Sequence, residues 1–112
     1  MGALVFATRL ASADPPACGT SDNPCPLQKW MRTNMGTPMA AGDLDTVGKA
    51  LDNTPGLNPD PTWATVWNQS SAAGSAAAKN KDTAGVKASC KTCHDAYKDK
   101  YKTQYRTRPV NK

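Results

Sequence analysis

Residues 82–106 read DTAGVKASCKTCHDAYKDKYKTQYR, with no proline and, after Gly85, no glycine. An aspartate at the start and the absence of later helix breakers predict one long helix from about Asp82 to about Arg106. At about 100° of rotation per residue, one face of this helix collects Val86, Cys90, Cys93, His94, Tyr97 and Tyr101. The sequence therefore predicts an apolar face that carries two thiols and one imidazole.

The thiols and the imidazole form the sequence C-x-x-C-H at Cys90, Cys93 and His94, which is the attachment signature of a c-type haem. The two thiols add across the two vinyl groups of the porphyrin, and the next imidazole becomes the proximal iron ligand. Positions i, i+3 and i+4 share one face of a helix, so all three groups reach the same macrocycle. His94 is the only histidine in the chain, which makes chance a poor explanation. We therefore expect one covalent haem c per chain.

Other uses of the cysteines fit the sequence less well. A structural zinc site needs four ligands with recognisable pairing, and the six residues between Cys18 and Cys25 do not give the usual spacing. A thioredoxin-like pair would lie at a helix N-terminus beside a βαβ pattern, and neither is predicted. Cys18 and Cys25 flank a loop rich in turn formers, which predicts a disulfide in an oxidising compartment. Two unpaired thiols, or a ligand pair, are the alternative.

Proline and glycine divide the preceding chain into three further helical stretches. The first is predicted to run from Pro26 to Gly36, where a break through Pro38 ends it. Asp43 and Asp60 are predicted to cap the second and third. No period-two alternation or internal repeat is present. The predicted fold class is all-α, an antiparallel up-down-up-down four-helix bundle with the haem on the C-terminal helix.

The third stretch combines aromatic and small residues. Trp63, Val66 and Trp67 form a stripe, and we expect Trp63 to contact the cofactor together with the tyrosines of the last helix. The small residues of 72–78 allow a neighbouring body to approach the backbone closely.

A methionine is predicted to fill the second axial position of the iron, because the chain has no second histidine. Met31, Met35 and Met39 are spaced i, i+4 and i+8, although the predicted helix break throws Met39 out of register. Met31 is the first choice because it lies in mid-helix beside Trp30, and Met35 is the second. Packing in the core is the competing explanation for each.

The charge of the 112-residue chain is uneven. Residues 1–78 carry four basic and six acidic side chains, net −2, whereas residues 79–112 carry ten and three, net +7. This distribution excludes a uniformly basic nucleic-acid binder. The basic segment predicts a docking surface for acidic redox partners, and a solvated helix face is the alternative. Its members are Lys87, Lys91, Lys98, Lys100, Lys102, Arg106, Arg108 and Lys112.

The N-terminal segment 1–17 resembles the end of a secretory signal. It has an apolar stretch at 3–7 and a small-x-small pattern at 11–13, and a disordered leader is the alternative. We therefore expect export to the periplasm, a haem domain at 18–106 and a flexible tail at 107–112. No apolar run is long enough to span a bilayer, so no membrane span is predicted.

The last third of the chain resembles the class II c-type cytochromes, the cytochrome c′ family and its low-spin relatives. The similarity is densest in the SCKTCHDAY sequence of 89–97. Weaker similarities are PTW at 61–63 before an Ala-rich helix, the Met31-Arg32 pair, and Gly-Asp at 42–43. The resemblance implies a four-helix bundle with the haem between helices, and members of the family often form homodimers.

The resemblance also implies roles for individual residues. His94 would be the proximal ligand, and Cys90 and Cys93 the thioether anchors. Met31 aligns with the first-helix residue on the distal side of the iron. Arg32 becomes a candidate partner for a haem propionate, with a solvated surface arginine as the alternative.

Two functions follow as expectations. The first is a His/Met-ligated, low-spin electron carrier, which is not an enzyme because no catalytic constellation accompanies the predicted haem. The second is a five-coordinate protein that binds NO or CO, with Met31 only as a steric gate.

Overall fold

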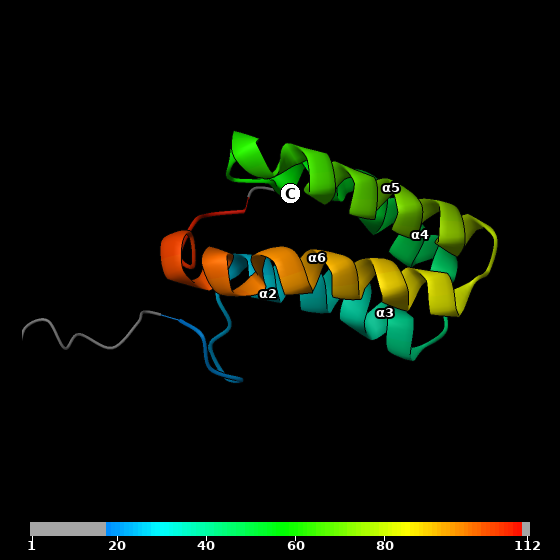
Figure 1. The fold of residues 1–112 in the computed structure, drawn as a ribbon. Coiled ribbons are helices and arrows are strands. Elements are labelled where there is room, and N and C mark those ends of the chain that lie inside the picture. Colours follow the sequence, from blue (N-terminus) through cyan, green and yellow to red (C-terminus); the bar gives the residue numbers. More distant parts are fainter. Residues whose placement is uncertain (1–17, 111–112) are drawn as a thin grey trace, which may run out of the picture.

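Four helical segments joined by short connections make up the computed structural model, which describes residues 18–110 (Figure 1). No strand occurs within this range, so the all-α prediction is confirmed. The predicted secretory segment at 1–17 lies outside the described residues, as do residues 111–112. In chain order the elements are α2 (Pro26–Met31), the π-helix η3 (Arg32–Gly36), α3 (Thr37–Ala40), α4 (Leu44–Asn53), the 3₁₀-helices η4 (Thr54–Leu57) and η5 (Pro61–Trp63), α5 (Ala64–Lys79) and α6 (Thr83–Gln104).

Three of the four segments begin where the sequence predicts. The carboxylates of Asp43, Asp60 and Asp82 each accept a hydrogen bond from a backbone amide in the turn that follows, at 2.9–3.1 Å. Such a bond satisfies one of the amides that the first helical turn leaves without a partner. The predicted caps of these segments are therefore confirmed.

The first segment differs from the prediction, because Gly36 and Pro38 do not end it. Helical geometry continues from Pro26 to Ala40, with η3 between two short α-helices. A prolyl nitrogen cannot donate to the preceding turn, and the wider π turn, with its i→i+5 bonds, accommodates the missing donor without ending the helix. The predicted break is therefore wrong, and one helical segment spans this region.

Close backbone approach holds α5 between α4 and α6. Gly74 of α5 lies so near Ser89 of α6 and Leu51 of α4 that any Cβ at this position would collide with them. At the other end of the α4–α5 contact, a Cβ on Gly48 would stand 3.2 Å from the Cβ of Ala78. The predicted run of small residues thus allows α5 to pack tightly on both sides.

The chain after α6 folds back onto the bundle. The Tyr105 hydroxyl donates to the Asp60 carboxylate at 3.3 Å, and the Arg108 guanidinium donates to the carbonyl of Leu57 at 3.4 Å. Val110 packs against the hydrophobic core. Of the predicted flexible tail at 107–112, the part that the structure describes therefore contacts the helices. Between residues 18 and 110, none of the helices is long and apolar enough to cross a membrane.

Candidate functional site

The C-x-x-C-H residues lie on the face of α6 that borders the cavities shared with α5 and the first helical segment. Cys90 and Cys93 are half-buried and not disulfide-bonded, and His94 is exposed. Cavities between α6 and the first helical segment are bordered by Cys93 and His94, and the deeper of them also by Cys90. Tyr97 and Tyr101 continue the same face and border the larger cavity. The structure therefore brings the predicted attachment residues together at one internal space.

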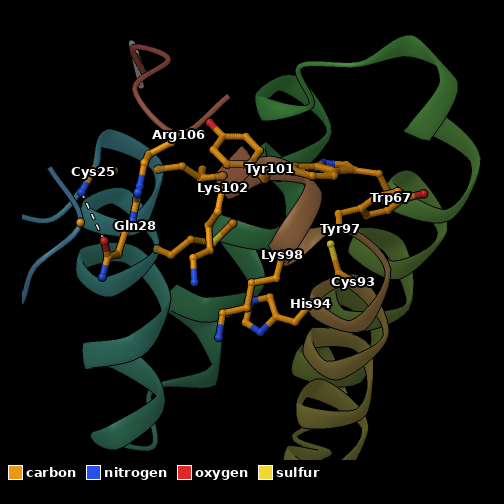
Figure 2. Close-up of a pocket in the computed structure, with 13 residues that line it drawn as sticks. Cys25, Gln28, Trp67, Cys93, His94, Tyr97, Lys98, Tyr101, Lys102 and Arg106 are labelled. Atoms are coloured by element: carbon orange, nitrogen blue, oxygen red, sulfur yellow. Dashed lines mark hydrogen bonds between the residues drawn. The ribbon is translucent and has the colours of Figure 1, made fainter. Parts of the chain in front are cut away.

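The larger cavity, of about 340 Å³, lies between α6, α2 and the loop that precedes α2 (Figure 2). This volume lies within the range of roughly 300–1,000 Å³ that small-molecule and cofactor sites occupy. Leu27, Met31 and Trp67 contribute apolar surface to its wall. Its charged border consists of the cationic side chains Lys98, Lys102 and Arg106, and no acidic residue of the described range borders it.

A smaller cavity of about 40 Å³ lies deeper in the bundle. Met31 and Met35 border it from the first helical segment, and Cys90, Cys93 and His94 border it from α6. Leu51 and Trp67 add apolar surface to its wall, and four residues with hydroxyl side chains also border it, namely Thr54, Ser70, Ser71 and Ser89. Both methionines that the sequence singles out for the distal position thus share this cavity with the imidazole.

Met39 also remains on the side of the first segment that faces α6. It is half-buried and borders an open groove together with Cys90 and His94. In a regular α-helix an i, i+4, i+8 row drifts by about 40° per step, and the wider π turn offsets part of this drift. The expected loss of register at Met39 is therefore not observed, because the π-helix replaces the predicted break.

The ionisable groups of the C-x-x-C-H sequence are shifted toward their neutral forms. Burial of part of the imidazole lowers the pKa of His94, and the nearby Lys98 ammonium lowers it further. Burial raises the pKa of both thiols, that of Cys93 to about 11. A neutral imidazole is the form that binds a metal ion. The thiolate is the nucleophilic form of a cysteine, so the raised pKa of the two thiols lowers their reactivity in this state of the chain.

The side chain of Tyr101 borders the larger cavity, and its hydroxyl lies near Arg108 of the C-terminal tail. It is buried and makes no hydrogen bond of normal geometry to any residue that the structure describes. Burial raises its pKa, and the nearby Arg108 guanidinium opposes this shift in part. Buried polar atoms without a partner are rare in folded proteins, and the Arg108 guanidinium is the nearest donor that the structure offers to this one.

Two predicted cofactor contacts lie away from the cavities. Trp63 is buried behind Tyr97, with ring centroids 4.8 Å apart, and its carbonyl accepts the Tyr97 hydroxyl at 3.0 Å. Trp67, one helical turn further on, borders both internal cavities instead. Arg32 is exposed and donates to the carbonyl of Ser21 at 3.3 Å. Helical spacing placed the two tryptophans on one stripe, and only packing decides which one faces the cavity.

Some cavity residues had no predicted role at a cofactor. The disulfide between Cys18 and Cys25 is formed, which confirms that prediction, and Gly19 and Cys25 of its loop border the larger cavity. Arg106 was predicted for an outer docking surface and instead borders this cavity. Comparison with protein-family models, with characterised proteins and with solved structures finds no match for this chain.

Proposed function

We propose that this chain is a monohaem c-type cytochrome, with Cys90 and Cys93 as thioether anchors and His94 as the proximal iron ligand. The observation that carries the proposal is that all three groups lie on one face of α6 and border the same deep cavity. Both thiols are free of disulfide bonds and therefore available for attachment. The neutral form that burial favours for His94 suits an iron ligand.

The charge of the larger cavity supports a haem in particular. A haem is a flat apolar ring with two carboxylates at its edge. The cavity offers apolar side chains and three cations, Lys98, Lys102 and Arg106, with no acidic residue of the described chain at its border. These residues fit a dianionic, otherwise apolar ligand better than they fit a polar or cationic one.

Met31 is the proposed distal ligand. It borders both internal cavities together with His94, whereas Met35 borders only the deeper one and stays the second choice. Met39 borders neither internal cavity, and it borders instead the open groove that Cys90 and His94 also line. A methionine ligand raises the reduction potential and blocks other ligands from the iron, which favours a protein that carries electrons.

The proposed activity is transfer of single electrons to and from other redox proteins, without catalysis of a chemical step. A bound haem supplies the reversible one-electron change of its iron. The side chains of α6 and α2 that border the cavity would hold the ring, and axial ligation and burial would set its potential. The basic side chains of α6 leave a positively charged surface near the cavity, which favours acidic partners.

Fold and compartment are part of the same proposal. We place the chain among the class II c-type cytochromes. We propose that its four helices run antiparallel in up-down-up-down order and that two chains can form a homodimer. The Cys18–Cys25 disulfide is typical of an oxidising compartment such as the periplasm.

One alternative function differs in the role of Met31. This side chain borders both internal cavities, so it can stand beside a bound haem as a steric gate instead of a ligand. If Met31 is only such a gate, the iron is five-coordinate and the protein binds NO or CO.

Optical spectra of the reduced protein, before and after addition of CO, test the proposal against this alternative. For the electron carrier we expect a six-coordinate low-spin spectrum that CO leaves unchanged. Met31→Ala is expected to open the iron to CO, whereas Met39→Ala serves as the matched control and leaves the spectrum as it is. A high-spin spectrum of the unmodified protein that changes at once with CO would support the gas-binding function.

A further inference from the structure

The disulfide-bonded loop forms one end of the larger cavity. Gly19 and Cys25 border the cavity there, next to Lys102 and Arg106 at the C-terminal end of α6. Figure 2 shows Arg106 beside Cys25 and Gln28 at this end, with Cys93 and His94 at the other. The cavity therefore has an attachment end, defined by the C-x-x-C-H residues, and a loop end, defined by Arg106 and the disulfide loop.

Arg106 packs directly against the backbone of the disulfide loop. Gly19 has a φ of +120°, which favours glycine, and a Cβ at this position would stand 2.6 Å from Nη2 of Arg106. The disulfide and a 2.8 Å hydrogen bond from the Gly19 amide to the carbonyl of Asn23 fix this part of the loop. The absence of a side chain at position 19 thus leaves the space that the guanidinium occupies.

The guanidinium of Arg106 has no anionic partner within 18–110. The ion pairs of that range involve Lys79, Lys81 and Lys91, and no carboxylate of the same range borders the cavity. Arg106 is nevertheless half-buried. A partly buried guanidinium is best stabilised by a carboxylate, whose two oxygens match its planar fork.

We propose that Arg106, positioned by Gly19 of the disulfide loop, binds a carboxylate of the haem. The inference deepens the proposed function and rests on it. In a porphyrin the vinyl edge and the carboxylate edge lie on opposite sides of the ring. Attachment of the vinyl edge to Cys90 and Cys93 therefore directs the carboxylates away from the attachment end. This assigns to Arg106 the role that the resemblance implied for Arg32, which lies outside the cavities and donates to Ser21 instead.

Reduction potentials of the holoprotein and three variants test the charge. A cation beside the haem favours the reduced form, because reduction adds negative charge. Arg106→Met is expected to shift the reduction equilibrium about tenfold toward the oxidised form, about 59 mV for one electron. Arg106→Lys retains the charge and is expected to restore most of the potential. Lys49→Met, which removes an exposed cation of α4, is the control and is expected to leave the potential unchanged.

Two glycine variants test the positioning by the loop. Gly19→Ala is expected to displace the guanidinium and lower the potential as Arg106→Met does, and to add nothing in the Arg106→Met background. Gly42→Ala is the matched control, because Gly42 also has a positive φ, +72°, but has no atom near its absent Cβ. Hydrogen exchange gives a second readout, since loss of the Arg106 contact is expected to speed exchange of the Gly19 amide.

Each failure has a distinct signature. A coloured protein whose potential responds to Arg32→Met but not to Arg106→Met would overturn this inference and leave the proposed function intact. Additive effects of Gly19→Ala and Arg106→Met would overturn the positioning role. A protein that carries no haem at all would instead overturn the proposed function.

Discussion

The two sides of α6 are built differently. Toward α5, small residues bring the backbones together, and a Cβ at Gly74 would collide with Ser89. Toward the first helical segment, cavities separate the helices, and Cys93, His94 and Met31 border them. Around Gly74 the chain thus fills the space beside α6 with its own atoms, whereas Trp67, Ser70 and Ser71 of α5 border the cavities. On the other side it leaves space where its chemically distinctive residues gather.

This difference separates two sources of stability. Around Gly74, α5 and α6 are held by direct packing, in which the atoms have protein neighbours. The α2 side lacks such neighbours around the cavities, so its full stability depends on a bound group that fills them. We infer that the first helical segment needs the bound haem for its full stability, whereas α4 and α5 do not.

The largest effect is expected from Cys90→Ala combined with Cys93→Ala, which removes both attachment points. The variant is expected to retain no covalent haem and to lose protection from hydrogen exchange in 26–40, while α4 and α5 remain protected. Hydrogen exchange followed by mass spectrometry measures both segments at once. Equal loss of protection in α4, α5 and 26–40 would contradict the separation into two sides.

A smaller effect is expected when the tightly packed side is disturbed. Gly74→Val places a branched side chain where no Cβ fits, and overpacking of this kind costs about 1–3 kcal/mol in unfolding free energy. Ala73→Val is the control, because Ala73 is exposed on the same helix. Valine is a poorer helix former than alanine and a better one than glycine, so helix propensity alone would make the control the less stable variant, and the opposite order reports the overpacking. Denaturant unfolding of the holoproteins measures the difference, and equal stability of the two variants would refute close packing at Gly74.

The smallest effect concerns the turn into α4. Side-chain and backbone hydrogen bonds from Thr46 lower the pKa of Asp43 below its ordinary value of 3.8. The stabilisation by this carboxylate is therefore present above pH 3.8 and is lost as the pH falls through the lowered pKa. Asp43→Asn keeps a capping oxygen without this titration. The melting temperature of the unmodified protein is expected to fall more steeply in acid than that of the variant, and parallel curves would contradict the assignment.

Local signals in the sequence predicted most of the fold. Asp43, Asp60 and Asp82 mark helix starts because a cap acts within one turn and needs no tertiary contact. The end of the first helix was missed because Gly36 and Pro38 are breakers only in a regular α-helix. The π turn changes the hydrogen-bond register around them.

The candidate site was predictable only in part. Cys90, Cys93 and His94 were singled out because their spacing on one helix is itself the signal. The choice between Trp63 and Trp67, and between Arg32 and Arg106, depends on which elements lie opposite one another. That information is tertiary, and helical periodicity does not contain it.

Mass analysis of the exported protein after trypsin digestion tests the central claim most directly. Cleavage after Lys91 separates Cys90 from Cys93, so their two peptides stay together only through a shared bridge. The account predicts that they remain joined after treatment with a reductant and that their mass includes one haem. Two separate peptides, each with the mass of its amino acids alone, would contradict it.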